Sequence, residues 1–212
     1  MVSVRWLGHS CFRIKNEESI IIDPHDGHYL GLKPPDERGD IILVTHDHTD
    51  HNQYKVVQKE GSRIIREAGR IRIGNIEIEG FNAFHDNQSG KKRGDVVIYS
   101  LEVEGIRMCH MGDIGHQLNA ELSEHLRGTD ILFIPVGGTY TVDADGAWNI
   151  VDSVRPRVVV PMHYMVGGLS LRIDPVERFL EARDVERSMV GNEIKLTKDD
   201  LPEKLEIWVF SL

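Results

Sequence analysis

The alternation of apolar and polar residues along the first half of the chain predicts short strands joined by tight turns. Val2–Trp6 and Cys11–Lys15 alternate with a period of two, which is typical of a strand with one buried face. Ile41–Val44 is instead continuously apolar and rich in β-branched residues, as expected for a strand that is buried on both faces. The other strands predicted in this half are Ser19–Ile22, Arg63–Ile65, Arg70–Ile73, Ile76–Phe81, Val96–Val103 and Arg107–Met111.

The second half of the chain mixes helical and strand patterns. Leu118, Leu122 and Leu126 recur at intervals of four, which places them on one face of a helix over Gln117–Leu126. The remaining elements predicted here are a helix capped by Asp143 that runs to Val154, a helix from Asp174 to Ala182, and strands at Ile131–Ile134, Val158–Val160 and Glu206–Phe210. Strands that alternate with helices imply buried sheets covered by helices, in the α/β class. No linker or repeat divides the chain, so we expect one domain over residues 1–212.

Composition narrows the class of protein. The 212 residues include 34 acidic and 25 basic side chains, so the formal net charge is −9, and 40% of the residues are apolar. This balance supports a folded core, and the acidic excess argues against a nucleic-acid-binding surface. No apolar run approaches the roughly 18 residues of a membrane span, and the first residues lack a signal-peptide pattern. With only Cys11 and Cys109, and no CxxC pair, we expect a cytoplasmic protein with reduced thiols and no membrane partner.

The strongest chemical signal follows the predicted strand Ile41–Val44 directly, in Thr45-His46-Asp47-His48-Thr49-Asp50-His51. Imidazole and carboxylate groups are the ligands of zinc and of neighbouring first-row metal ions. His46 and His48, two apart in an extended segment, can face one ion, and Asp50 and His51 can reach a second beyond a turn. A solvated loop that happens to be rich in histidine is the alternative, but four potential ligands within six residues favour metal.

Four ligands do not complete two metal sites, so further ligands must come from elsewhere in the chain. His85, Asp113 and His163 each follow a predicted apolar strand and precede a glycine-rich or irregular stretch. In α/β proteins, bound molecules and ions lie where strands end and loops begin. A lone histidine after a strand is a weak signal, but together these three residues supply the number that is missing.

With these residues the chain resembles the metallo-β-lactamase-fold hydrolases, whose HxHxDH motif is matched by His46, His48, Asp50 and His51. It is similar to their small single-domain members related to ascorbate-phosphate lactonases and to the phospholipase D that acts on N-acylethanolamine phospholipids. The features that recur, in the same order, are Trp6-Leu7-Gly8-His9-Ser10-Cys11-Phe12, Ile22-Asp23-Pro24, His110-Met111-Gly112-Asp113-Ile114-Gly115 and Pro161-Met162-His163-Tyr164.

The resemblance implies an αββα sandwich of two mixed β-sheets flanked by helices, with two divalent metal ions at one sheet edge. Zinc is the first choice for these ions, with manganese and iron as alternatives. The family pattern assigns His46, His48 and His85 to one ion, Asp50, His51 and His163 to the other, and Asp113 to a bridge between them.

Two adjacent ions predict hydrolytic chemistry. Metal binding lowers the pKa of water from 15.7 to about 7, so a bridging hydroxide can attack at neutral pH, and the second ion can stabilise the developing oxyanion. We expect three catalytic side chains near the ions: Asp47 as proton acceptor or support for a histidine, His9 as substrate contact or proton donor, and His110, with His116 as the alternative, as general acid. For His9 a structural turn residue, and for His110 a side chain packed into the sheet, are the alternatives. Asp23 either orients a ligand histidine or only ends its strand before Pro24.

These observations predict a binuclear metal-dependent hydrolase that cleaves an ester, lactone or phosphoester bond of a small-molecule substrate. The alternatives within catalysis are a phosphodiesterase or nuclease that acts on nucleotides and a mononuclear iron oxidoreductase of the same fold. A non-catalytic metal-binding protein is a third class, which the full set of ligands disfavours. The strand Glu206–Phe210 leaves homo-oligomerisation open.

The loop Asp86–Asp95 carries the only basic triplet of the chain, Lys91-Lys92-Arg93. It is either a solvated hairpin tip or a mobile rim that brings cations over the metals to hold a phosphate or carboxylate of the substrate. Arg93 is the best candidate for such a contact, because its planar guanidinium pairs with oxyanions at two points.

Overall fold

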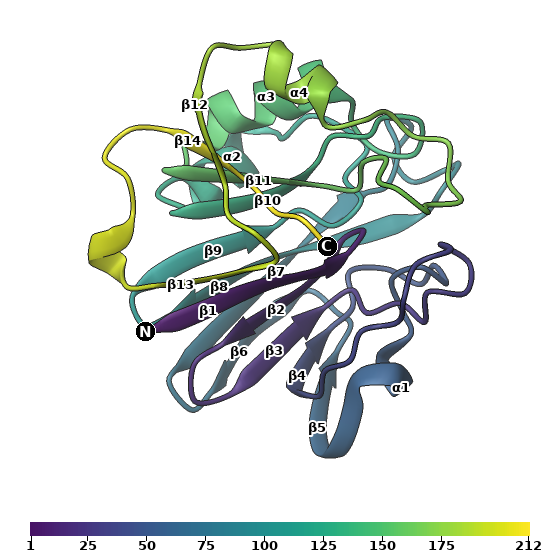
Figure 1. Ribbon diagram of the computed structural model, residues 1–212, viewed down its shortest axis with the longest axis vertical. Helices are drawn as coiled ribbons and strands as arrows, with labels where there is room; N and C mark the ends of the chain where they lie inside the picture. Colours follow the sequence, from purple (N-terminus) through teal and green to yellow (C-terminus); the bar gives the residue numbers. More distant parts are fainter.

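The computed structural model describes residues 1–212 and has two packed β-sheets with helices on their outer faces (Figure 1). The strands are β1 (Val2–Gly8), β2 (Cys11–Lys15), β3 (Ser19–Ile22), β4 (Gly39–Leu43), β5 (Gln58–Ile65), β6 (Gly69–Ile73), β7 (Ile76–Phe84), β8 (Asp95–Val103), β9 (Ile106–His110), β10 (Ile131–Pro135), β11 (Val158–Met162), β12 (Glu186–Met189), β13 (Glu193–Leu196) and β14 (Glu206–Val209). The helices are α1 (Tyr54–Val57), α2 (Ala120–Leu126), α3 (Ala144–Val154) and α4 (Glu177–Glu181), with a short 3-10 helix η1 (Lys198–Asp200).

The two sheets have six and eight strands. Their strand orders are β13-β1-β2-β3-β4-β5 and β12-β14-β11-β10-β9-β8-β7-β6. Each sheet mixes the two kinds of pairing: β3 and β4 are parallel beside antiparallel β1 and β2, and β10 and β11 are parallel while β8 and β9 are antiparallel. The predicted αββα sandwich of two mixed sheets is therefore confirmed.

The main core lies between the two sheets and explains the sequence pattern of β4. Ile41 and Leu43 pack into this core, whereas Ile42 and Val44 pack into a smaller cluster on the outer face, which Val57 of α1 covers. A strand with both faces covered is apolar at every position, and this is why the run is unbroken. On the other side of the molecule α3 packs against β10, α2 and α4.

The direction of the strands determines where the ligand-bearing loops meet. In the six-stranded sheet β1, β3 and β4 are parallel to one another. In the eight-stranded sheet β7, β9, β10 and β11 are likewise parallel to one another. Their carboxyl ends lie at one edge of the sandwich, where the long loops gather on the right of Figure 1. The residues that directly follow these strands include His9, Asp23, Thr45–His51, His85, Asp113 and His163.

Some boundaries differ from the sequence-based expectation. The helix expected from Gln117 begins at Ala120, because Asn119 caps it by accepting a hydrogen bond from Leu122 N (2.8 Å). Asp143 caps α3 as predicted, with its carboxylate accepting from Gly146 N (2.9 Å). No element was predicted from the sequence at α1, β12 or β13. α1 is a single turn, and the two strands are short and lie at sheet edges.

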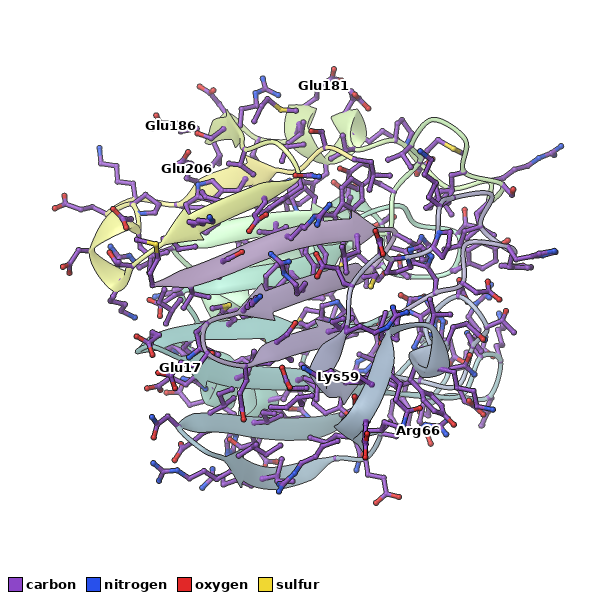
Figure 2. The ribbon with its side chains drawn as sticks, turned by 60° about the horizontal axis from the view of Figure 1, so that its bottom comes forward. Glu17, Lys59, Arg66, Glu181, Glu186 and Glu206 are labelled. Atoms are coloured by element: carbon purple, nitrogen blue, oxygen red, sulfur yellow. The ribbon has the colours of Figure 1, made fainter.

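The surface carries many of the charged side chains. Glu17, Lys59 and Glu186, labelled in Figure 2, are exposed. None of the helices has both the length and the apolar character that crossing a membrane requires.

Candidate metal centre

The segment Thr45–His51 leaves β4 at the edge where the loops gather and forms a tight turn. Val44 N donates to Ile65 O of the neighbouring strand (3.0 Å), and His51 N donates to His48 O (2.9 Å). The turn places His46 and His51 in the interior, 7% and 0% exposed, while His48 and Asp50 stay partly exposed. Local backbone geometry therefore brings four potential ligands close together within one short turn.

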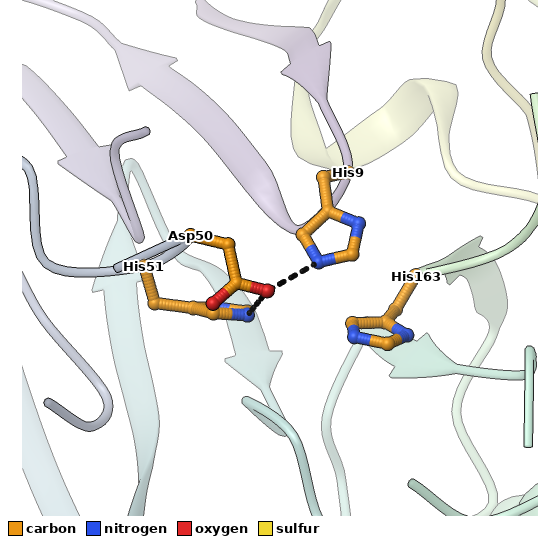
Figure 3. Close-up of side chains that lie close together, drawn as sticks. All are labelled: His9, Asp50, His51 and His163. Atoms are coloured by element: carbon orange, nitrogen blue, oxygen red, sulfur yellow. Dashed lines mark ion pairs between the residues drawn. The ribbon is translucent and has the colours of Figure 1, made fainter. Parts of the chain in front are cut away.

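The predicted ligands gather into two adjacent groups whose donor atoms lie within 4.8 Å of one another. The members are His46, His48 and His85 in the first group, and His9, Asp50, His51 and His163 in the second group (Figure 3). Apart from His9, this is the division that the family resemblance implied.

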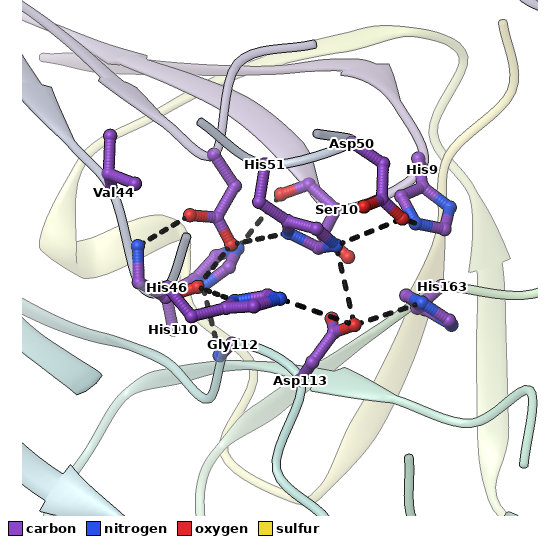
Figure 4. Close-up of polar contacts among 12 residues, drawn as sticks. His9, Ser10, Val44, His46, Asp50, His51, His110, Gly112, Asp113 and His163 are labelled. Atoms are coloured by element: carbon purple, nitrogen blue, oxygen red, sulfur yellow. Dashed lines mark hydrogen bonds and ion pairs between the residues drawn. The ribbon is translucent and has the colours of Figure 1, made fainter. Parts of the chain in front are cut away.

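Asp113 lies between the two groups (Figure 4). Its Oδ2 atom is 3.1 Å from His163 Nε2, 3.3 Å from His51 Nε2, 3.4 Å from His85 Nε2 and 3.9 Å from His46 Nε2. The turn that carries it depends on Gly112, which has φ +53° and whose Cβ, if present, would lie 2.6 Å from Val96 Cγ2. Only glycine fits there. A single carboxylate oxygen thus contacts members of both groups, as a bridging ligand does.

The donor atoms fit a metal ion better than they fit one another. His46 Nε2, His51 Nε2 and Asp113 Oδ1 are buried and have no hydrogen-bond partner. Ligand atoms around a tetrahedral zinc ion, with bonds of about 2.0–2.1 Å, are about 3.3 Å apart, and the contacts of Asp113 with His51 and His85 match this spacing. Because buried polar atoms are rarely left unpaired, the cluster has the character of a metal centre.

The electrostatics of the cluster favour a cation. Burial lowers the pKa of His46 and of His9 to about 3, so both imidazoles are neutral, the form that binds metal. Burial would also lower the pKa of His51, but Asp113 and Asp50 raise it well above its usual value. The buried carboxylates therefore draw positive charge into the site, and a divalent ion supplies that charge on binding.

Behind the ligands, Asp23 and Thr45 form a hydrogen-bonded support. Asp23 Oδ1 accepts from Thr45 N (2.7 Å), and its Oδ2 accepts from Thr45 Oγ1 (2.7 Å) and lies 2.9 Å from His51 Nδ1. Because the Thr45 hydroxyl donates its one proton to Asp23, its 2.9 Å contact with His46 Nδ1 is a bond that the imidazole donates. Both imidazoles then direct an unprotonated Nε2 into the cluster. The orienting alternative for Asp23 fits this geometry, and the part played by Thr45 had no signal in the sequence.

Of the three residues predicted as catalytic, the structure brings only His9 into the ligand cluster. The side chain of Asp47 is 76% exposed, and its Oδ1 accepts from Asn52 Nδ2 (2.7 Å) and Arg66 Nη2 (2.6 Å), contacts that lower its pKa and make it a weaker proton acceptor. His110 is fully buried, with Nε2 2.9 Å from Ser10 O and Nδ1 accepting from Gly112 N (3.1 Å). It therefore supports the turn before Asp113, and the proton-transfer roles of Asp47 and His110 stay predictions.

A cleft of about 380 Å³ opens over the cluster. Its lining includes the ligands His48, Asp50, His85, Asp113 and His163, together with Asp47, Thr49, Tyr29, Tyr140, Leu171 and Arg93. The cleft therefore gives a small molecule access to both ligand groups, with apolar surface and a cation close by.

The loop Asp86–Asp95 is tied down by its first residue. The Asp86 carboxylate accepts hydrogen bonds from four backbone N–H groups, those of Gln88, Gly90, Lys92 and Arg93, at 2.7–3.0 Å. Burial opposes its ionisation, but these bonds lower the pKa of Asp86 to about 2. The loop is thus a closed turn built around a carboxylate. Of the two alternatives from the sequence, a solvated hairpin tip and a mobile rim, these bonds favour the first for the loop backbone.

Within this loop Arg93 alone of the basic triplet lines the cleft. Its guanidinium lies over the ring of Tyr140, 4.7 Å from the centroid, and its Nη2 donates to Thr139 O (3.3 Å). Lys91 and Lys92 are exposed and line no part of the cleft. The structure therefore separates the triplet into one arginine at the site and two solvated lysines.

Comparison with known proteins gives independent information on the class of this protein. Residues 3–163 match the family described as the beta-lactamase superfamily domain. A UPF0173 metal-dependent hydrolase of Thermoplasma acidophilum is 33% identical over 202 residues, which cover 84% of this chain and 89% of the relative. Another of Pyrococcus abyssi is 29% identical and covers 98% of this chain and 100% of the relative.

Solved structures extend the likeness to the whole fold. A crystal structure from Thermotoga maritima, described as a proposed zinc-dependent hydrolase of the metallo-β-lactamase superfamily, has a TM-score of 0.81 and 30% sequence identity, and each chain covers 100% of the other. A structure from Parabacteroides distasonis, with a TM-score of 0.69 and 19% identity over 97% of this chain and 92% of that one, shares the fold.

Proposed function

The chain belongs to the beta-lactamase superfamily and is one of its metal-dependent hydrolases, and from this premise we propose a binuclear enzyme that cleaves an ester, lactone or phosphoester bond of a small, anionic substrate. Zinc is the first choice for the two ions, with manganese or iron(II) as alternatives. The seven ligands are His46, His48, Asp50, His51, His85, Asp113 and His163.

The position of Asp113 carries the proposal of two ions. Its Oδ2 lies within 3.4 Å of His85 in one ligand group and of His51 and His163 in the other. A single tetrahedral ion takes four ligands, so seven ligands in two groups around one shared carboxylate favour two ions. Two metal ions, when bound, supply a water nucleophile at neutral pH and polarise the oxygen that becomes negative in the transition state.

The chain itself contributes orientation and charge. Asp23 and Thr45 hold the imidazoles of His51 and His46 with their Nε2 atoms facing the ions. The buried carboxylate of Asp113 has its pKa held well below the usual range by His163 and His51, against the effect of burial, so it stays ionised as a ligand must. Correct tautomers and fixed charges lessen the rearrangement that the site needs when metal and substrate bind.

Arg93 supports an anionic substrate. It is the only lysine or arginine that lines the cleft, and its guanidinium is held over Tyr140 beside the ligand groups. Of its five N–H donors the protein uses one, on Thr139 O, which leaves donors for a carboxylate or phosphate. Tyr29, Tyr140 and Leu171 add apolar surface that suits the carbon skeleton of a small molecule.

A substrate screen on zinc- and manganese-loaded protein tests the function. We expect hydrolysis of at least one class among carboxylate-bearing lactones, anionic aryl esters and phosphate monoesters, with neutral counterparts of each as controls. Preference for bis-p-nitrophenyl phosphate over every lactone and carboxylic ester would select the phosphodiesterase alternative. Oxygen uptake by protein that holds one iron, without hydrolysis of any substrate, would refute the proposal.

A further inference from the structure

His9 reaches the metal centre through a strained piece of backbone. It follows Gly8 at the end of β1, where the pairing of β1 with β2 shifts register between Trp6 and Gly8. Its φ of +55° lies in the left-handed region that non-glycine residues rarely adopt. Irregularities of this kind re-aim a side chain, and strained residues persist where the surrounding structure holds them.

One local and one long-range hydrogen bond hold the strained turn. The carbonyl oxygen of His9 accepts from Trp6 Nε1 (3.0 Å) and from the backbone N of His163 (3.3 Å). The second bond joins the turn directly to the loop that carries a ligand of the second group. The positions of His9 and His163 are therefore coupled, and their ring centroids lie 4.1 Å apart.

The imidazole of His9 is buried without a hydrogen-bond partner. The residue is 1% exposed, and neither Nδ1 nor Nε2 makes a hydrogen bond. Nε2 lies 3.3 Å from Asp50 Oδ2, and the same oxygen is 3.5 Å from His51 Nε2 (Figure 3). These separations are those of atoms that share one ion, since zinc ligands are about 3.3 Å apart.

We propose that His9 is a fourth protein ligand, through Nε2, of the ion held by Asp50, His51 and His163. The inference rests on the proposed binuclear function and extends it. The second group then offers three imidazoles and a carboxylate besides Asp113, whereas the first offers three imidazoles. The two ions consequently differ in the number of protein ligands, and the first keeps more room for a substrate atom.

The competing role for His9 is that of an N–H donor that orients Asp50. In that case Nε2 carries a proton and makes no bond to metal. The two roles differ in the state of one nitrogen, so the decisive experiment observes that nitrogen directly.

Protein labelled with ¹⁵N in its histidine rings and loaded with ¹¹³Cd gives this observation by NMR. We expect two cadmium signals and a one-bond ¹¹³Cd–¹⁵N coupling on His9 Nε2, assigned by its loss in His9→Gln. His25 is the internal control: its ring is also buried, 1% exposed, but its Nε2 lies 3.1 Å from Leu7 O outside both ligand groups, so it should show no coupling.

Competition with a chromophoric chelator provides a second readout. His9→Gln should weaken binding of one of the two ions by more than the roughly 10–100-fold that loss of an orienting partner costs, and leave the other unchanged, whereas His25→Gln should keep both. Two cadmium signals with an uncoupled, protonated His9 Nε2 would overturn this inference and leave the binuclear function standing. Fewer than two bound cadmium ions would instead refute the binuclear function itself.

Discussion

Replacing Asp23 with asparagine tests whether the hydrogen bonds behind the ligands control metal affinity. The two oxygens of Asp23 accept three bonds, one from Thr45 N on Oδ1 and those from Thr45 Oγ1 and His51 Nδ1 on Oδ2. Asparagine has one acceptor oxygen and one NH₂ group, so in either orientation the NH₂ group faces a donor. The residue is fully buried, and water cannot replace the lost bond.

The size of the effect follows from these contacts. If the NH₂ group faces Thr45 N, one buried N–H is left unpaired, at a cost of about 1–3 kcal/mol in folding free energy. If it faces His51, the imidazole must place its proton on Nε2, the atom that the metal needs. Loss of such an orienting partner reduces metal affinity by about 10–100-fold, or about 1.4–2.7 kcal/mol.

Chelator competition on Asp23→Asn, with Asp47→Asn as matched control, measures this effect. Asp47 lies in the ligand segment but is exposed and paired with Asn52 and Arg66, so its substitution should leave metal affinity unchanged. Thermal unfolding of the metal-free variants separates lost stability from lost affinity. Wild-type affinity in a folded Asp23→Asn protein would refute the idea that the Asp23–Thr45 support sets the tautomers of the ligands.

Three further predictions concern the bridge, the arginine and the loop. Asp113→Ala should lower both metal content and turnover, while His125→Ala on α2 should keep both; full metal and near-normal turnover in Asp113→Ala would exclude a bridge. Arg93→Ala should raise KM for an anionic substrate by roughly tenfold, about 1.4 kcal/mol, with little change for a neutral ester, and Lys92→Ala should have little effect on either; equal losses on both substrates would indicate a role in folding. Because the pKa of Asp86 is lowered from 3.8 to about 2, its contribution to stability is complete above pH 4 and is lost as pH falls toward 2. The difference in Tm between wild type and Asp86→Asn should narrow over that range. A constant difference would contradict the claim that the ionised Asp86 carboxylate stabilises the loop.

The sequence indicated most of the fold, because each buried strand leaves a local pattern. The run Ile41–Leu43 of β4 is continuously apolar since both of its faces are covered, and β1 and β2 show the alternation of strands with one main buried face. β12 and β13 were not predicted, because each is an edge strand of only four residues held by backbone pairing with β14 and β1. Chain-end pairing of this kind depends on the rest of the fold.

The ligand set was predictable for a related reason. HxHxDH is local, and the distant ligands follow strand ends in the order of the family motifs. Side-chain direction at those ends was harder to predict: His110 is the last residue of β9 and points into the interior, while Asp113, three residues later, reaches the cluster after the turn at Gly112. The support from Thr45 joins residues that are distant in sequence, and its contacts exist only in the folded protein.

The number of metal ions per chain tests most directly the central claim that the site is binuclear. Asp113 can act as a bridging ligand only if both ligand groups hold metal. Protein purified without added chelator, measured by plasma mass spectrometry against a quantitative amino-acid analysis, should contain close to two transition-metal ions per chain. A reproducible single iron per chain, with activity that depends on oxygen, would contradict the account.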